Sequence, residues 1–244
     1  MHPIVFKNIT HVYAAQPVLD GLSFYFEENL ITAVIGRSGG GKSTLLQIIN
    51  GLIKPTSGEV FVYGEKLDYD NINTLRLNIG YSVQGTGLFP HMTAYDNIYL
   101  PARITKKTRD EVNKRIDLLM ELVDLNKEFK NKFPYQLSGG EQQRVGLCRA
   151  MILNPQIFLL DEAFAALDPT TRNEVHLELL KLQKFEPRTI VLVTHDLNEA
   201  LKLGDRIMIL EKGKIQQFGT EQDILNKPAN QFVIDFINSQ KNII

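Results

Sequence analysis

Cysteine and tryptophan are nearly absent from this chain. Its 244 residues include one cysteine, Cys148, and no tryptophan. A single thiol excludes an internal disulfide, so disulfide bonds do not stabilise this fold as they stabilise small secreted domains. Cys148 lies in an apolar stretch that we expect to be helical, and we interpret it as a packing residue of a protein from a reducing compartment.

The chain also lacks a charge excess and a long apolar run. Lys and Arg number 27 against 28 Asp and Glu, a formal net charge of -1, so no long-range attraction to nucleic acid is expected. No stretch approaches the roughly 18 apolar residues of a membrane span, and the N-terminus does not begin like a signal peptide. We therefore expect a soluble protein that acts at a membrane only through a partner.

Repeats and low-complexity segments are missing as well, and the length suits one domain with an inserted subdomain. β-Branched runs punctuated by Gly and Pro predict strands in the first quarter, at residues 4–6, 22–26, 31–35 and 58–62. Helical spacing begins after Thr108, and Ser138 is expected to cap a further helix because Glu141 stands three residues later. The middle of the chain is therefore expected to be helical.

Beyond the helical middle, short apolar runs alternate with helical patterns. The runs at 157–160, 189–194 and 206–210 predict buried parallel strands, which is typical of an α/β protein. From Lys214 we expect a short strand, a turn at Gly219 and two small helices.

A glycine-rich loop stands between a predicted strand and a predicted helix. The loop runs from Gly36 to Gly41 and is followed by Lys42 and Ser43, the pattern G-x-x-x-x-G-K-[ST] in the context that makes it specific. Glycines let backbone N–H groups surround phosphates at a helix N-terminus. We expect Lys42 to reach the terminal phosphates and the Ser43 hydroxyl to complete a Mg²⁺ shell.

Three further polar residues follow predicted strands. Asp161 and Glu162 come after the run 157–160, and His195 comes after the run 189–194, so all three are expected at the carboxyl edge of the sheet. Asp161 suits Mg²⁺, Glu162 suits polarising an attacking water, and His195 suits contact with the γ-phosphate or that water. Each has a structural alternative, since acidic pairs at strand ends and single histidines are often only satisfied polar groups.

The segment Leu137-Ser138-Gly139-Gly140-Glu141-Gln142-Gln143-Arg144 resembles the signature of the ATP-binding cassette (ABC) transporter family, and the resemblance extends over nearly the whole chain. It implies an α/β P-loop NTPase core, RecA-like with a mostly parallel sheet, an N-terminal antiparallel β-subdomain and an inserted α-helical subdomain at 85–153. The whole of 1–244 would then be a single nucleotide-binding domain. ATP and Mg²⁺ are the implied cofactors.

The resemblance also assigns site residues. Tyr13 would stack on adenine, although alone it would be interpreted as a strand residue at a domain edge. Gln84 would touch Mg²⁺ and the attacking water, and Asp168 would lie in a loop that crosses to a second subunit. The implied nucleotide-binding set is Tyr13, Gly36, Arg37, Ser38, Gly39, Gly40, Gly41, Lys42, Ser43, Thr44, Ser138, Gly139, Gly140 and Asp168. Two copies of the chain, or a pair of related subunits, would thus enclose two ATP molecules between head-to-tail partners.

Two residues depart from the family pattern. Ala163 stands where proline usually follows the catalytic Glu, and Ala165 stands where Gly or Ser is commoner. Loss of a fixed φ is expected to loosen the Glu162 loop by a few tenths to about 1 kcal/mol and to slow or uncouple turnover at most.

Three segments, 87–93, 200–206 and 228–233, resemble the ATPases of osmoprotectant importers, which carry glycine betaine, choline and carnitine. That resemblance implies an integral membrane permease, an extracytoplasmic substrate-binding protein and a place on the cytoplasmic face of the cell membrane. Many such ATPases continue into paired CBS domains, for which this sequence has no counterpart. Phe89 and Met92 are expected to be exposed in a groove for the permease's coupling helix, with ordinary loop packing as the alternative.

Two rival functions remain at this point. The same chemistry would serve an ATPase of a lipid-transport or export system. A non-transport ATPase acting on DNA or ribosomes is disfavoured, because no sustained heptads separate Lys42 from Ser138 and only one cassette is present.

Overall fold

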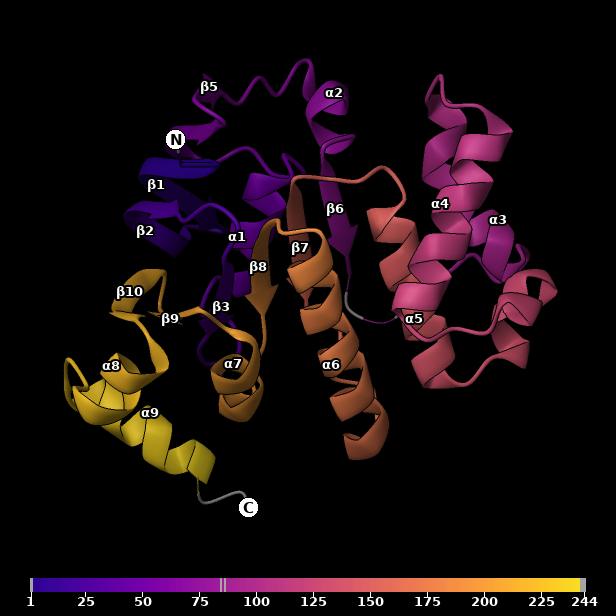
Figure 1. Cartoon of the computed structure of the whole chain (residues 1–244). Helices are drawn as coiled ribbons and strands as arrows, with labels where there is room; N and C mark the ends of the chain where they lie inside the picture. Colours follow the sequence, from indigo (N-terminus) through magenta and orange to yellow (C-terminus); the bar gives the residue numbers. More distant parts are fainter. Residues whose placement is uncertain (1, 84, 86, 242–244) are drawn as a thin grey trace. The chain divides into compact units, whose positions relative to one another are not determined.

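The computed structural model (Figure 1) describes residues 2–83, 85 and 87–241. These residues divide into two compact units. The first unit combines the N-terminal part of the chain, through Arg76, with the part from Thr189 onward. The second unit is the intervening segment, Leu77–Arg188. The expected helical subdomain at 85–153 falls inside the second unit, and its boundaries stay a prediction.

The first unit contains an antiparallel sheet in the order β2-β1-β4-β5. Its strands are β1 (Ile4–Tyr13), β2 (Gln16–Phe26), β4 (Ser57–Val62) and β5 (Glu65–Lys66). Alternate residues of β1, among them Ile4 and Phe6, are buried, as the two-residue period of a half-buried strand requires. The expected antiparallel β-subdomain is thus confirmed.

The first unit also contains strands in the order β10-β9-β3-β8. These are β3 (Ile31–Ile35), β8 (Thr189–Val193), β9 (Arg206–Glu211) and β10 (Lys214–Gly219). β3 runs parallel to both β8 and β9, whereas β10 is antiparallel to β9. β3 and β8 are buried at every residue, which explains their mostly apolar sequences.

The helices of the first unit follow its strands along the chain. They are α1 (Lys42–Ile49), α2 (Ile72–Arg76), α7 (Leu197–Leu203), α8 (Glu221–Asn226) and α9 (Gln231–Lys241). One apolar core joins β3 and β9 to α7, α8 and α9, with Ala33, Ala200 and Phe236 among its members. Gly219 does not form the expected turn: it ends β10, paired with Ile207, and a Cβ there would approach Asp223 Cβ to 2.8 Å.

The second unit pairs two parallel strands with a set of helices. The strands are β6 (Ile79–Ser82) and β7 (Ile157–Asp161). The α-helices are α3 (Ala94–Tyr99), α4 (Arg109–Leu122), α5 (Gly139–Met151) and α6 (Pro169–Phe185). Short 3₁₀ turns lie at η1 (Leu100–Ile104), η2 (Lys127–Asn131) and η3 (Pro134–Gln136). The helical middle predicted from the sequence is confirmed.

Local sequence explains where these helices begin. Thr108 caps α4 and Ser138 caps α5, each through a reciprocal capping box with a glutamate three residues on. Cys148 is fully buried in α5, as expected, and burial raises the pKa of its thiol. Within the described part of the chain, no helix combines the length and apolar character needed to cross a membrane.

Candidate phosphate-binding site

The glycine loop of the first unit joins the buried end of β3 to the start of α1. A Cβ on Gly36 would lie 1.9 Å from the carbonyl oxygen of Leu210 in β9, and a Cβ on Gly41 would lie 2.6 Å from that of Val18. Gly41 adopts a φ of 98° as it leads into α1, and its carbonyl accepts from the N–H of Leu45 at 2.9 Å. Steric exclusion therefore requires glycine at both positions, and the loop has the local form that the sequence predicts.

Lys42 is held inside this loop. Its Nζ donates to the carbonyls of Gly36 at 2.8 Å and Arg37 at 3.0 Å, and the residue is only 6% exposed. The ammonium is therefore positioned by the backbone that it would share with a bound phosphate. Of the other loop positions, Arg37, Ser38, Gly39 and Ser43 are exposed, whereas Gly40 and Thr44 are buried.

Two contacts join the glycine loop to the C-terminal part of the first unit. The N–H of Gly213, in the β9–β10 turn, donates to the Gly40 carbonyl at 3.3 Å. The Arg37 guanidinium lies 5.3 Å from the ring centroid of Phe232 in α9, a cation–π geometry. Neither contact was predicted from the sequence, because the residues of the loop do not indicate which distant segment packs against it.

Tyr13 ends β1 and is 45% exposed. The His11 ring packs edge-on against it, with centroids 4.5 Å apart. His11 is buried, and neither of its ring nitrogens has a hydrogen-bond partner among the described residues. The turn that follows Tyr13 places Ala14 and Ala15 at positive φ, 45° and 68°, which is a strained conformation for alanine.

His195 leaves the sheet at the same edge as the glycine loop. β3 and β8 are parallel neighbours, Val34 pairs with Val193, and the N–H of Thr194 donates to the Val34 carbonyl at 3.2 Å. His195 is exposed in the short connection before α7. The expected placement at a carboxyl strand edge is thus observed, and the role of His195 stays a prediction.

The acidic pair lies in the second unit. Asp161 is the last residue of β7 and is buried, and the hydroxyl of Tyr81 in β6 donates to its Oδ2 at 3.3 Å. Burial and the Asp161 charge raise the pKa of Tyr81, so this phenol stays a donor to the carboxylate. Sequence reasoning did not identify Tyr81, although its place on the neighbouring strand was the available signal.

Glu162 follows directly in an unusual backbone conformation. Its φ is 45°, a left-handed value that is costly for a residue with a long side chain. The Glu162 carbonyl accepts from the N–H of Ala165 at 3.3 Å, and Ala163 is buried. The tight turn that follows β7 therefore fixes the backbone of Glu162.

The signature segment forms the start of α5. Ser138 Oγ accepts from the Glu141 N–H at 3.3 Å, and Glu141 Oε2 accepts from the Ser138 N–H at 2.7 Å. A hydroxyl that accepts in this way still carries a proton to donate. A Cβ on Gly140 would lie 2.3 Å from Cγ2 of Thr171 in α6, so this glycine is also required by helix packing. A Cβ on Gly139 would have no described neighbour closer than 3.9 Å.

Arg144 and Asp168 stabilise the same region. The Arg144 guanidinium binds both carboxylate oxygens of Glu178 in α6, with its Nη2 2.8 Å from Oε1. Asp168 caps α6, and its Oδ1 accepts from the N–H groups of Thr170 and Thr171, both at 3.1 Å. A side-chain hydrogen bond with Thr171 is the largest cause, together with these backbone N–H bonds, of the lowered pKa of Asp168. Its assignment to a subunit-crossing loop stays a prediction.

Gln84 lies outside the described residues. In the segment that follows it, Phe89 is 42% exposed, but Met92 is partly buried, so the expected exposure of Met92 was wrong. The Met92 N–H donates to the Phe89 carbonyl at 3.1 Å and closes a turn. Asn97 Nδ2 holds the turn by donating to the carbonyls of Phe89 and Met92, each at 3.1 Å.

Solved structures resemble this chain over most of its length. MJ0796, an ATP-binding cassette described as dimeric in a post-hydrolysis state bound to ADP and Pi, matches with a TM-score of 0.80 and 36% identity. That match covers 89% of this chain and 98% of MJ0796. CbiO1 from Clostridium perfringens, described as part of the ABC transporter complex cbiONQ, matches with a TM-score of 0.86, 27% identity, and coverage of 99% and 96%.

Curated relatives include importer ATPases for quaternary ammonium compounds. The glycine betaine/carnitine/choline transport ATP-binding protein OpuCA of Bacillus subtilis is 46% identical, covering 97% of this chain and 63% of the relative. The glycine betaine uptake system ATP-binding protein YehX of Escherichia coli is 40% identical, covering 96% of this chain and 76% of the relative. The chain spans 60–63% of the length of OpuBA and of the OpuCA proteins.

The family model described as ABC transporter matches residues 19–165, which include both the glycine loop and the signature segment. The fold class and the family resemblance expected from the sequence are thereby confirmed. The chain belongs to the ABC transporter family and has the ATP-binding cassette fold.

Proposed function

We propose that this protein is the ATP-hydrolysing subunit of an ABC importer for betaine-type solutes. The observation that carries the proposal is the glycine loop, whose backbone already holds Lys42 by two carbonyls at the N-terminus of α1. Such a loop presents backbone N–H groups, a helix dipole and an ammonium to the phosphates of a nucleotide.

The proposed chemistry is in-line attack of water on the γ-phosphate. Glu162 polarises the water, His195 donates to the γ-phosphate, and Lys42 stabilises the charge that develops there. The fixed backbone at Glu162, with its φ of 45°, supports a role that needs one orientation. Tyr13 stacks on adenine in this proposal, because its ring is 45% exposed at the end of β1.

The donor chemistry of the chain fits Mg²⁺. Ser43 and Asp161 offer a hydroxyl and a carboxylate, and Gln84 adds an amide oxygen. Phosphate and water would supply the other ligands of the ion. When bound, Mg²⁺ supplies charge stabilisation to the phosphate oxygens.

We propose that two copies of the chain close around ATP and that this closure drives transport. Ser138, Gly139 and Gly140 would donate to the γ-phosphate bound by the partner, with Asp168 in the crossing loop. Support comes from the α5 N-terminus, which is capped by Ser138, and from MJ0796, which is described as a dimer bound to ADP and Pi. Reopening after hydrolysis would move a membrane permease between two access states.

The transported solute and the partners are proposed from similarity. Relatives that are 40–46% identical are named for uptake of glycine betaine, carnitine or choline. Proteins named for import of spermidine/putrescine and of sulfate/thiosulfate are 38% and 39% identical. We therefore assign a quaternary ammonium solute, an integral permease, an extracytoplasmic binding protein and a place at the cytoplasmic face of the cell membrane.

Two experiments test this proposal. The first is sedimentation of Glu162→Gln with ATP, where we expect a stable dimer that does not form with ADP or in the double variant with Lys42→Ala. ATP binding without a dimer would contradict the closure mechanism.

The second experiment is mass spectrometry of proteins that co-purify with the tagged chain from its native membrane. A permease together with a binding protein that retains quaternary ammonium ligands is expected. Lipid-handling proteins would instead favour a lipid-transport system, and ribosome or DNA factors without a permease would overturn transport.

A further inference from the structure

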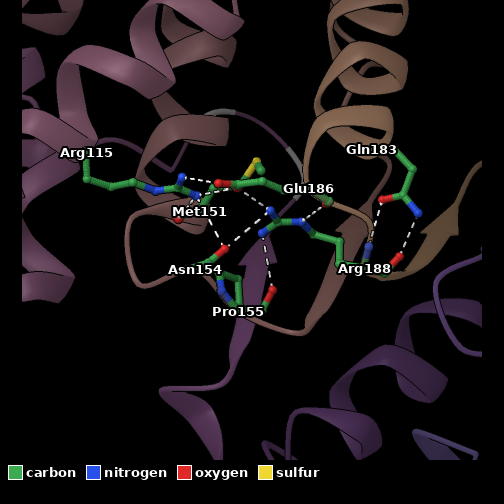
Figure 2. Close-up of polar contacts among 7 residues, drawn as sticks. All are labelled: Arg115, Met151, Asn154, Pro155, Gln183, Glu186 and Arg188. Atoms are coloured by element: carbon green, nitrogen blue, oxygen red, sulfur yellow. Dashed lines mark hydrogen bonds and ion pairs between the residues drawn. The ribbon is translucent and has the colours of Figure 1, made fainter.

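An ion cluster in the second unit contains two arginines and one glutamate (Figure 2). Glu186 Oε2 accepts from Arg115 Nη2 and from Arg188 Nη2, both at 2.6 Å, and Arg115 Nη1 also contacts Oε1. Arg115 comes from α4, whereas Glu186 and Arg188 lie between α6 and β8. One carboxylate is thus shared by two guanidinium groups.

This cluster has one more positive than negative charge, and its arginine side chains are largely shielded from water. The side chains of Arg188 and Arg115 are only 3% and 16% exposed. Carbonyls of Pro155 and Met151 accept from the two arginines at 3.2 Å and 3.5 Å, but a carbonyl dipole does not neutralise a full charge. Burial, together with repulsion from Arg115, lowers the pKa of Arg188. An uncompensated cation in such surroundings favours a second anion.

A cavity of about 220 Å³ opens beside the cluster. Arg115 and Asn154 line it together with Lys107, and Val112 and Ile152 form its apolar wall. Arg115 Nε is buried and has no hydrogen-bond partner among the described residues. Asn154 Oδ1 is already engaged by both arginines at 3.5 Å, which leaves its amide N–H groups as donors.

One carboxylate, Glu111, also lines the cavity, but it is occupied elsewhere. Its Oε2 accepts from the N–H and the hydroxyl of Thr108, both at 2.8 Å. The hydrogen bond from the Thr108 backbone, with lesser contributions from Lys107 and Lys114, lowers the pKa of Glu111. The surrounding segment 103–115 carries six basic and two acidic side chains, a net +4 in a chain of net charge -1. The local field therefore attracts anions despite Glu111.

We propose that this cavity binds a small oxyanion of the phosphate type, with Arg115 and Lys107 as its charge partners and Asn154 as a neutral donor. The two arginines and Lys107 exceed Glu186 and Glu111 by one charge, which a bound anion would balance. The anion is either free inorganic phosphate or the phosphate of a lipid headgroup. Its residues are separate from those of the glycine loop, so the proposal does not depend on ATP hydrolysis.

The test for free anion is thermal unfolding of the full chain with added inorganic phosphate, against potassium chloride of equal ionic strength. Lys42→Ala is the background for every sample, because the glycine loop would otherwise bind the same probe. At about ten times the dissociation constant, phosphate should raise Tm by about 3 °C in this background. Lys107→Gln should lose most of that rise, and Arg115→Gln all of it.

The matched control is Lys106→Gln, which removes the same charge from the adjacent exposed residue but not from the cavity wall. It should keep the full rise in Tm. An equal rise in all variants, or no rise in any, would overturn the proposal. Lys107 is exposed, so its variant is expected to fold even if Arg115→Gln disrupts the ion cluster.

Vesicles distinguish the two sources of phosphate. The Lys107→Gln and Lys106→Gln proteins are pelleted with phosphatidylglycerol vesicles and with phosphatidylcholine vesicles. If Lys107→Gln pellets less than Lys106→Gln with phosphatidylglycerol vesicles but not with phosphatidylcholine vesicles, the bound anion is the phosphate of a lipid headgroup. Equal pelleting together with the site-specific rise in Tm would assign free phosphate.

Discussion

Two regions that we propose to contact nucleotide, the glycine loop of the first unit and the signature segment of the second, are held in place by different forces. In the first unit, the glycine loop is fixed by close backbone approach, for which the 1.9 Å separation between a Gly36 Cβ and the Leu210 oxygen is the clearest sign. In the second unit, Gly140 also packs closely on Thr171, but side-chain hydrogen bonds and an ion pair add to this contact, through Ser138, Asp168 and Arg144. A clash with backbone atoms is costly because the backbone has little room to shift, whereas a single hydrogen bond contributes only about 1 kcal/mol. Substitutions should therefore affect the two regions differently.

The largest effect is expected for Gly36→Ala. The new Cβ would collide with β9 at a φ of 155°, so we expect a loss of roughly 4 kcal/mol in the free energy of unfolding, together with loss of nucleotide binding. Gly39→Ala is the control, because its Cβ would meet nothing within 4 Å and only the φ of 78° opposes it, at about 1 kcal/mol. Urea denaturation followed by circular dichroism measures both, and equal losses would refute the steric account.

Arg144→Gln should give the largest effect in the second unit. It leaves Glu178, whose side chain is 5% exposed, without its main partner, at a cost of about 3 kcal/mol. Burial already raises the pKa of Glu178 above its ordinary 4.5. A carboxyl with a raised folded-state pKa contributes stability below its ordinary pKa, and that contribution is lost as pH rises through the folded value.

The Arg144→Gln deficit should therefore shrink as pH falls toward 4.5, the ordinary value for Glu178. Urea midpoints measured across this range test the sign. Glu178→Gln in the same background should remove the pH dependence. A deficit that is constant with pH would show that the cost is lost packing.

Ser138→Ala should have a smaller, graded effect. It removes the acceptor for the Glu141 N–H and should cost about 1 kcal/mol of stability. Ser138→Thr keeps a capping hydroxyl and should stay within a few tenths of a kcal/mol of the unmodified protein. If Ser138→Ala lowered the free energy of unfolding as much as Gly36→Ala, the proposed difference between the two regions would be wrong.

The smallest effect is a gain, at the turn beside Tyr13. Ala14→Asn with Ala15→Gly should stabilise the protein by about 0.5 kcal/mol, because both positions have positive φ. Ala200→Gly, in the interior of α7, is expected to have the opposite sign at more than about 1 kcal/mol, because a buried methyl group is lost as well. Thermal unfolding compares the two, and a destabilised turn variant would contradict the conformational argument.

Local signals in the sequence predicted much of this arrangement. The capping box at Ser138, the glycine loop before Lys42 and the apolar run into Asp161 each depend on neighbouring residues, and each was found where expected. Contacts between distant segments were not predicted, as Leu210 behind Gly36 and Phe232 beside Arg37 show. Tertiary packing decides which distant residues meet, and the local sequence does not indicate it. The partial burial of Met92 was also not predicted.

The burial of Cys148 gives the chain a practical advantage for spectroscopy. The thiolate is the species that reacts with maleimide reagents, and a fully buried thiol with a raised pKa supplies almost none of it. Because the sequence contains no second cysteine, one introduced at an exposed position would be the only thiol to take a dye. Fluorescent labels for following the proposed closure between two copies can therefore be attached without first removing the native residue.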